Sequence, residues 1–289
     1  MDDELRIETA RTEQRTLLEV VAAQGNDAPY DLLTVLSEKC FDPGFSGPSL
    51  VLLAFREEEP AGFAVVCGRF LRLLVVSRPH RHTGVGSALL TQAEQHVAKD
   101  GQMRIAVGAE AGNYFVPGVP EDDPAVRFFL EKLGYDSGPA TSNLECSLND
   151  NPLLYGSDSD EVRRALASDR QRVTRFIEEN FGRIWAFETQ AALRNNPPTV
   201  FIAERNGGID GFSAHDSNNR GLGFFGPTGV QTSQRGKGLG KALLLASLRD
   251  LRNLGYPKAV IPWTDAIDFY RKSCGAVVGH RFVSYVKTL

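Results

Sequence analysis

Three glycines alternate with two lysines in the stretch RGKGLGKALL, residues 235–244. A Leu-rich pattern that is typical of an amphipathic helix follows the glycines. The first turn of a helix leaves its backbone N–H groups without intrahelical acceptors, and the helix dipole adds partial positive charge there. Glycines let a ligand approach these groups closely, while Arg235, Lys237 and Lys241 add charge. The stretch therefore predicts a binding site for a phosphate or pyrophosphate.

Two common phosphate-binding motifs do not fit this stretch. The dinucleotide pattern GxGxxG, counted from Gly236, requires a glycine where Lys241 stands. A P-loop requires GxxxxGK followed by Ser or Thr, and no such run occurs in the chain. The phosphate ligand must therefore belong to another class.

The glycine stretch occurs twice. RHTGVGSALL at 81–90 aligns with RGKGLGKALL at 235–244 with an offset of 154 residues. A second pair, AVRFFLEKLGY at 125–135 and AIDFYRKSCGA at 266–276, has an offset of 141, so the first half carries about 13 extra residues in the loop 108–124. Two copies of one domain explain this pattern, and we place them at 1–149 and 150–289, joined near 149–160. We expect the apolar part of the extra loop to pack against the partner domain or the substrate.

The same succession of elements positions the glycine turn in each copy. Apolar, strand-like runs precede the turn, an amphipathic helix follows it, and a further strand, a short helix and closing strands complete the copy. The strand runs lie at 49–55, 61–70 and 71–76 in the first copy and at 199–204, 211–215 and 222–230 in the second, and the short helices at 125–133 and 266–273. The pattern predicts an α/β (α+β) fold, with a mixed, mostly antiparallel sheet flanked by helices in each of two domains.

Composition and charge describe an ordinary globular chain with an uneven charge distribution. The 289 residues are 42% hydrophobic and 24% charged. Residues 1–150 contain 13 Lys and Arg against 23 Asp and Glu, whereas residues 151–289 contain 19 against 13. A basic second half indicates an anionic ligand there. The basic residues are spread out and form no nucleic-acid-binding motif, so we predict no nucleic-acid partner.

Metal, membrane and export signals are absent from the sequence. The four cysteines form no CxxC, and the five histidines show no HExxH or HxH spacing, so we predict no metal site. The start MDDELRIETA is acidic and lacks the features of a secretory signal. No apolar run approaches the ~18 residues that span a bilayer. We therefore expect a cytoplasmic protein without a membrane partner; its oligomeric state is not predicted.

The pattern (Q/R)xxGxG before a Leu-rich helix resembles the GNAT superfamily of acetyl-coenzyme A dependent N-acetyltransferases. It occurs in both halves, with a strand before it and FYRKSCGA after the second copy, and tandem GNAT domains are also the layout of some amino-sugar acetyltransferases. The resemblance implies acetyl-CoA as cosubstrate, with the pyrophosphate on the glycine loop and the pantetheine arm along the strand FGPTGVQT. The implied cosubstrate-binding residues are Val230, Thr232, Arg235, Gly236, Lys237, Gly238, Leu239, Gly240 and Lys241 in the second copy, and Arg81, Gly84, Val85 and Gly86 in the first.

The resemblance also implies a general acid. Tyr270 occupies the place of the family's tyrosine, which lies near the sulfur and can protonate the departing thiolate. A phenol with a pKa near ~10 is a suitable donor to a thiolate of similar basicity. In the first copy the corresponding residue is Phe129 or Leu130, depending on the alignment, and neither has a hydroxyl. The first domain is therefore predicted to be catalytically degenerate and the second to be catalytic.

An acceptor amine must lose a proton before or during its attack, which requires a base. Asp265, just past the strand VIPW, is the first candidate, and the cap of the following helix is its alternative role. The other candidates are Glu204, Asp268 and His215.

We expect the acceptor to be a primary amine of a small molecule, with amino sugars among the favoured substrates. The alternatives are an N-acetyltransferase acting on proteins or peptides and a non-catalytic acetyl-CoA-binding regulator. An aromatic pair in the helical stretch GRIWAFETQAAL, Trp185 and Phe187, belongs either to the core or to the wall of the acceptor pocket.

Overall fold

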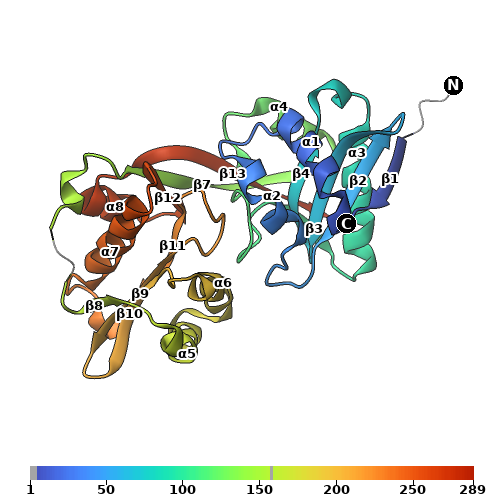
Figure 1. Ribbon diagram of the computed structural model, residues 1–289. Helices are drawn as coiled ribbons and strands as arrows, with labels where there is room; N and C mark the ends of the chain where they lie inside the picture. Colours follow the sequence, from blue (N-terminus) through green and yellow to red (C-terminus); the bar gives the residue numbers. More distant parts are fainter. Residues whose placement is uncertain (1–4, 157–158) are drawn as a thin grey trace. The chain divides into compact units, whose positions relative to one another are not determined.

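The computed structural model describes residues 5–156 and 159–289 and divides the chain into two compact units (Figure 1). Unit 1 comprises the chain up to Ala140 together with Arg281–Leu289, and unit 2 comprises Thr141–His280. The acidic start at 1–4 and residues 157–158 of the predicted joining stretch lie outside the described residues.

The division between the units differs from the predicted boundary at 149/150, because two long strands are each divided between the units. The end of β7 (Asp136–Ser147) pairs with a strand of unit 2, and the end of β13 (Val277–Thr288) pairs with a strand of unit 1. The last nine residues of the chain, Arg281–Leu289, thus complete the first unit. Local sequence patterns do not show which partner each end of a strand will take.

Unit 1 is a mixed sheet with flanking helices. Its neighbouring strands β1 to β4 are antiparallel, β5 is parallel to β4, and the end of β13 is antiparallel to both β5 and the short β6. Helix α3 packs on a core formed by β2, β3 and β4, as its apolar face requires. The elements are β1 (Leu5–Thr9), α1 (Arg15–Gly25), α2 (Leu32–Phe41), β2 (Leu50–Arg56), β3 (Glu59–Cys67), β4 (Phe70–Val76), α3 (Val85–Lys99), β5 (Arg104–Val107), β6 (Val119–Pro120) and α4 (Pro124–Lys132).

Unit 2 repeats this architecture. Its antiparallel sheet has the order β11, β10, β9, β8, and β12 pairs with the end of β7. Along β9, Val200 and Ile202 pack with α5 and α6, whereas Phe201 and Ala203 pack with α7, so these helices cover opposite faces of the sheet. The elements are β8 (Val162–Arg164), α5 (Arg170–Phe181), α6 (Arg183–Arg194), β9 (Val200–Arg205), β10 (Gly208–His215), β11 (Phe225–Val230), α7 (Leu239–Asn253), β12 (Lys258–Thr264) and α8 (Ile267–Cys274).

The predicted fold class is confirmed: each unit is an α/β domain with a mixed sheet and flanking helices. The helices predicted at 125–133 and 266–273 are α4 and α8, shifted by one residue. In the extra loop, Phe115 is buried and packs edge to face on Tyr30 of the same unit, with ring centroids 6.4 Å apart. No helix in the described part of the chain is long and apolar enough to cross a membrane.

Candidate functional site

Strand β11 in unit 2 separates from its parallel neighbour β12. The two strands meet at the bridge Phe224↔Val260, and beyond it β11 is the edge of its sheet. The separation follows from a β-bulge. The four residues Phe225–Thr228 of β11 lie opposite only the three residues Ser213–His215 of β10. A bulge bends its strand and adds twist. The outer backbone groups of β11 can therefore hydrogen-bond an extended ligand, as another strand would.

The glycine loop after β11 has a backbone that requires glycine. Gly238 is the N-cap of α7 with φ of 85°, and Gly236 has φ of 79°. A Cβ atom built on either glycine would meet no atom within 4 Å, so the space above the loop is open. The first bond of the helix runs from the N–H of Ala242 to the carbonyl of Gly238 at 3.1 Å. The N–H groups of Leu239, Gly240 and Lys241 precede that bond and are available to an anion.

Basic side chains surround this loop. Arg235 donates from Nε to the carbonyl of Val230 at 3.2 Å, which ties the loop to the end of β11. Lys237 donates to the Gln234 side chain at 2.7 Å. Arg235, Lys237 and Lys241 are all exposed, so each can reach an anion bound over the helix N-terminus.

Tyr270 on α8 is packed against the start of β11. Its side chain is only 7% exposed, and its ring contacts Phe225 and Phe269 with centroid separations of 6.3 and 5.0 Å. The hydroxyl makes no hydrogen bond within the described part of the chain. Burial, with a smaller contribution from the Cys274 thiol, raises the pKa of Tyr270 to about 12. The phenol therefore stays protonated at neutral pH and can donate to a ligand atom.

Asp265 lies exposed in the turn between β12 and α8. Its alternative role as a helix cap is not observed, because α8 has Ala266 at its N-cap and no side-chain cap. The Ala266 N–H is instead accepted by the Thr264 hydroxyl at 3.1 Å. The Asp265 carboxylate is therefore not used as a cap, and its catalytic role stays a prediction.

The other candidate bases are engaged elsewhere. Glu204 forms ion pairs with Arg172 and Arg163, which keep the pKa of its carboxyl below the usual value although burial opposes them. Asp268 is exposed and pairs with Arg271 at 3.1 Å. Glu204 is therefore held in an ion-pair network, and Asp268 lies in an exposed surface pair.

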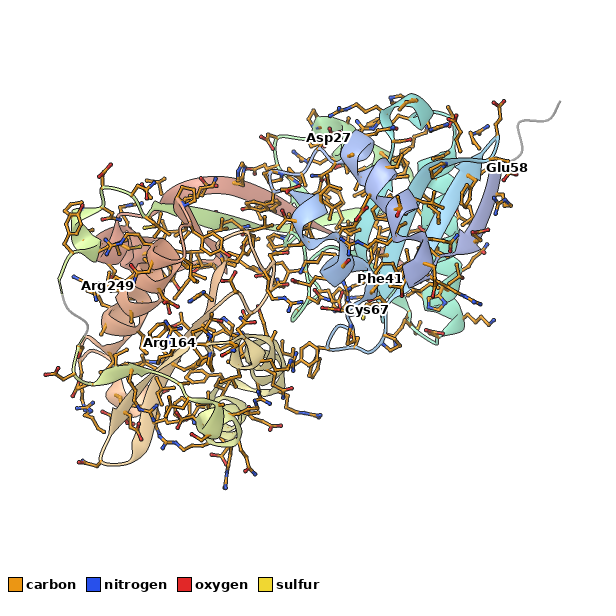
Figure 2. The ribbon with its side chains drawn as sticks, in the orientation of Figure 1. Asp27, Phe41, Glu58, Cys67, Arg164 and Arg249 are labelled. Atoms are coloured by element: carbon orange, nitrogen blue, oxygen red, sulfur yellow. The ribbon has the colours of Figure 1, made fainter. Side chains whose placement is uncertain are left out.

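His215 is held inside unit 2. Its ring is fully buried, with Nδ1 3.0 Å from Asp216 and Nε2 2.8 Å from Asp250. Asp250 also accepts from Arg164, which Figure 2 labels. Burial alone lowers the pKa of His215, but the bonds to the two carboxylates outweigh it and raise the pKa above its usual value. With both ring nitrogens occupied, His215 serves stability rather than proton transfer.

The stabilisation from His215 is expected to weaken as the pH rises. Because the folded-state pKa lies above that of unfolded histidine, about 6.5, the contribution is complete below that pH and is lost as the pH rises through the folded-state pKa. Urea unfolding of the wild type and His215→Gln between about pH 5.5 and 9 measures this. The difference in unfolding free energy should shrink with rising pH, and a difference that grows would contradict the assignment.

The first copy reproduces the loop geometry. Gly84 is the N-cap of α3 with φ of 90°, and its carbonyl accepts from the N–H of Ala88 at 3.0 Å. In the second copy, the carbonyl of Gly238 accepts from Ala242 in the same way. Arg81 donates from Nε to the carbonyl of Val76 at 3.2 Å. Its guanidinium also pairs with Asp27 at 2.6 Å, a residue that Figure 2 labels. Asp27 also pairs with Arg78 at 2.8 Å, so Arg81 shares one carboxylate with a second cation, whereas Arg235 has no such ion pair among the described residues.

The structure identifies the residue that replaces the tyrosine in unit 1. The second glycine of each loop faces a phenylalanine ring: a Cβ on Gly86 would lie 3.5 Å from Phe129, and one on Gly240 would lie 3.7 Å from Phe269. Phe129 thus corresponds to Phe269. The next residue, Leu130, is buried like Tyr270 and stands in its place.

Unit 1 also has a bulge, and its extra residue is Arg72. Leu71 pairs with Val66 of β3 and Leu73 pairs with the adjacent Val65, so Arg72 has no partner on β3. The pairing of Phe70 with Ala106 matches the bridge Phe224↔Val260 at the offset of 154, so Arg72 corresponds to Gly226.

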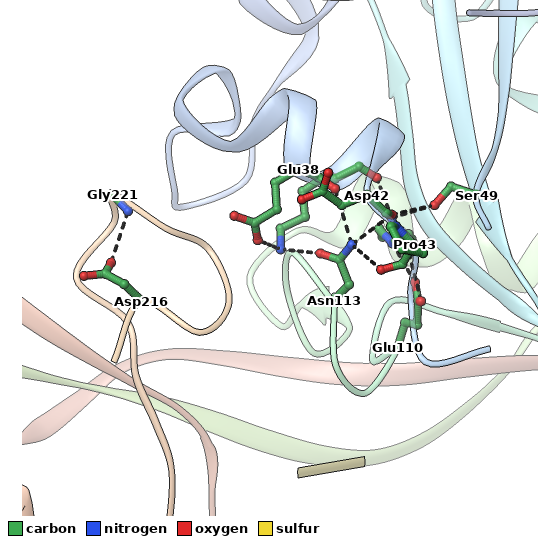
Figure 3. A network of polar contacts seen from close by, with 10 residues as sticks. Glu38, Asp42, Pro43, Ser49, Glu110, Asn113, Asp216 and Gly221 are labelled. Atoms are coloured by element: carbon green, nitrogen blue, oxygen red, sulfur yellow. Dashed lines mark hydrogen bonds and ion pairs between the residues drawn. The ribbon is translucent and has the colours of Figure 1, made fainter. Parts of the chain in front are cut away.

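A buried ion pair fills the bulge of unit 1. Arg72 donates to both carboxylate oxygens of Glu110, at 2.5 and 2.9 Å, and to the carbonyl of Lys39 and the hydroxyl of Ser49. Figure 3 labels Glu110 and Ser49 in this network of polar contacts. Arg72 and Glu110 are 3% and 1% exposed. The corresponding residue in unit 2 is Gly226, with φ of 128°. A Cβ atom placed on Gly226 would meet no other atom within 4 Å, so the bulge of unit 2 is open there. Sequence reasoning missed this difference, although the offset of 154 aligns Arg72 with Gly226.

No group of three or more His, Cys, Asp or Glu side chains that could hold a metal ion occurs among residues 5–156 and 159–289. The four cysteines are free and buried.

Comparisons with known proteins relate both halves to one family. Residues 162–276 match the acetyltransferase (GNAT) family, and residues 20–117 match an acetyltransferase (GNAT) domain. No curated protein matches the chain in sequence.

Solved structures share the fold at low identity. A GCN5-related N-acetyltransferase from Sphaerobacter thermophilus (TM-score 0.70, 19% identity) covers 100% of this chain and 96% of its own. A tandem GNAT protein from the clavulanic acid biosynthesis pathway (TM-score 0.70, 17% identity) covers 99% and 98%. A glucosamine N-acetyltransferase region of a fungal multi-domain GH3 β-N-acetylglucosaminidase (TM-score 0.77, 19% identity) covers 99% of this chain, which spans 38% of that protein.

Proposed function

Because the chain belongs to the GNAT family of acetyltransferases and carries one such domain in each half, we propose that unit 2 transfers acetyl from acetyl-CoA to a primary amine of a small molecule. The family uses acetyl-CoA as cosubstrate. The observation that carries the proposal is the buried Tyr270, which packs at the start of the bulged edge strand that leads into the glycine loop. Its hydroxyl has no hydrogen-bond partner among residues 5–156 and 159–289. Unit 1 lacks this hydroxyl and serves as a non-catalytic domain.

The cosubstrate is proposed to bind along β11 and its loop. The pyrophosphate takes the N–H groups at the start of α7, with Arg235, Lys237 and Lys241 supplying charge. The pantetheine arm pairs with the free edge of β11, with Val230 and Thr232 at its end. The glycine loop of unit 1, from Arg81 to Gly86, is a second, weaker anion site because its arginine is already paired with Asp27.

The proposed reaction is a direct transfer. The amine nitrogen attacks the thioester carbonyl, a C–N bond forms, and the C–S bond breaks. Asp265 takes the proton that the amine loses, and a backbone N–H of β11 stabilises the oxyanion of the tetrahedral intermediate. Tyr270 gives its proton to the departing thiolate. Its raised pKa favours recovery of that proton afterwards.

Assays of thiol release from acetyl-CoA test this proposal. The acceptors are amino sugars, polyamines, aminoglycosides and a lysine peptide. Steady release with a small amine supports the proposal, and release with the peptide alone would make the chain a protein acetyltransferase. If coenzyme A binds but no amine leads to thiol release, the result would favour a non-catalytic acetyl-CoA-binding regulator.

A negative charge at the helix N-terminus is expected to raise the KM for acetyl-CoA only when it is placed in the catalytic unit. Gly238→Glu should raise the KM for acetyl-CoA at least about 10-fold, equivalent to ~1.4 kcal/mol, because the carboxylate repels the pyrophosphate and φ of 85° strains a side chain. Gly84→Glu is the matched control, since Gly84 has φ of 90° in the same cap. Gly238→Ala introduces the backbone strain without the negative charge, so it shows how much of the effect is due to strain. Equal effects of the two Glu variants would contradict the assignment of catalysis to unit 2 alone.

A further inference from the structure

Four aromatic rings form a cluster in unit 2 on the sheet face covered by α5 and α6. Phe181 stacks on Trp185 with centroids 5.6 Å apart and an interplanar angle of 23°. Phe181 also contacts Phe212 at 5.5 Å and Phe176 at 5.9 Å. Gly182, with φ of 95°, makes the sharp turn from α5 into α6 that brings Phe181 and Trp185 together.

The cluster touches the strand that carries the proposed chemistry. A Cβ on Gly229 would lie 2.6 Å from Cε1 of Phe181, so the Phe181 ring rests directly on the backbone of β11. Gly229 follows the bulge and precedes Val230, where the cosubstrate is proposed to bind. The stack of Phe181 and Trp185 therefore begins at β11, next to the proposed cosubstrate site.

On the proposed cosubstrate placement, the acceptor approaches from this side of the sheet. Tyr270 packs in a core with residues of α7, and the glycine loop leads into α7, so both lie on the opposite face. Because α5 and α6 cover the remaining face, an amine that attacks the thioester reaches it past their side chains.

Trp185 is the exposed end of the stack. Its side chain is 37% exposed, whereas Phe212 beneath is fully buried. Phe181 covers the indole and Phe212 contacts it at 6.3 Å, which fixes its orientation before any ligand arrives. A preorganised aromatic surface binds a ligand without the cost of ordering its own side chain.

The chemistry of this surface selects among amine acceptors. The negative face of an aromatic ring attracts polarised C–H groups, which line the faces of a pyranose ring. A linear polyamine would instead need carboxylates along its length. The two glutamates at the end of α5, Glu178 and Glu179, are paired with Arg183 at 3.6 Å and Arg175 at 2.8 Å.

We propose that Trp185 stacks on the sugar ring of a hexosamine acceptor and so presents its amino group to the thioester at β11. This inference rests on the proposed function and names its acceptor class. It makes Trp185 a specificity-determining residue and glucosamine a suitable probe.

Intrinsic fluorescence tests binding without turnover. The chain has two tryptophans, so Trp263→Phe leaves Trp185 as the reporter. Titration with glucosamine should change its emission saturably, whereas spermidine should leave it unchanged. A response to spermidine but not to glucosamine would overturn the inference.

Kinetics supply the second test. Trp185→Ala should raise the KM for glucosamine about 10-fold and leave the KM for acetyl-CoA within about twofold, and Trp185→Phe should recover most of the loss. Ile184→Ala is the matched control, because Ile184 is the neighbouring residue on α6 and is 38% exposed. Glucosamine turnover that Trp185→Ala leaves unchanged would overturn the inference but not the acetyltransferase. If no amine leads to thiol release from acetyl-CoA, the proposed function is overturned. The fluorescence titration would then still show whether Trp185 binds a sugar.

Discussion

Tyr270→Phe is expected to lower kcat for acetyl transfer about 100-fold and to change the KM for acetyl-CoA little. The variant keeps the ring that packs on Phe225 and Phe269 and loses only a hydroxyl that makes no hydrogen bond to any described residue, so the fold should be unaffected. The thiolate would then leave without a proton donor. Steady-state thiol release measures the effect.

Tyr135→Phe in unit 1 is the matched control for this variant. Tyr135 is also buried, and its hydroxyl donates to Glu94 at 3.0 Å, away from either glycine loop. It should keep the wild-type kcat, whereas an unchanged kcat in Tyr270→Phe would remove the tyrosine from the mechanism.

The pH profile gives an independent check on Tyr270. Because its pKa is raised to about 12, the phenol stays protonated throughout the neutral and mildly alkaline range. Activity should rise with pH as the acceptor amine loses its proton, and no alkaline decline from Tyr270 should occur below about pH 10.

Glu110→Ala is expected to destabilise unit 1 by about 3–5 kcal/mol. The variant leaves the Arg72 guanidinium buried without its counter-charge, and an uncompensated buried charge is costly. Urea unfolding of the full chain, followed by probes for each unit, measures the loss, since two domains need not unfold together. Acetyl transfer by unit 2 should survive under conditions where both units are folded.

A surface ion pair of the same unit provides the comparison. Glu121 pairs with Arg281 at 3.0 Å, and both side chains are exposed, so Glu121→Ala should cost no more than about 1 kcal/mol. The double variant Arg72→Met/Glu110→Leu should recover most of the stability lost in Glu110→Ala. Equal losses in the two single variants would show that burial of the Arg72 pair has no special importance.

Local patterns in the sequence predict the repeated architecture well. The glycine turns, the helices behind them and the hairpins depend on residues close together in the chain, and the structure has them where the patterns indicate. The tandem GNAT organisation is confirmed for the same reason: two copies of a short motif recur in the same context.

Other features depend on how distant segments meet. The bulges at Arg72 and Gly226 arise from the register of neighbouring strands, which no local pattern encodes. The pairing of His215 with Asp250 joins residues 35 positions apart, so sequence reasoning listed His215 as a base. The sequence allows two alignments, which place either Phe129 or Leu130 at the position of Tyr270. Only the packing of the Phe129 ring against Gly86 in the structure distinguishes them.

The division of β13 between the units bears on how the chain is made. During synthesis, the segment Arg281–Leu289 leaves the ribosome after all of unit 2, yet it supplies the strand that borders β5. Unit 1 therefore spends the translation of about half the chain with β5 as an open edge, which invites pairing with other chains. A fragment ending at residue 149 would keep that edge permanently and should aggregate. The two acetyltransferase domains are repeats in sequence, but the first takes one of its strands from the end of the chain.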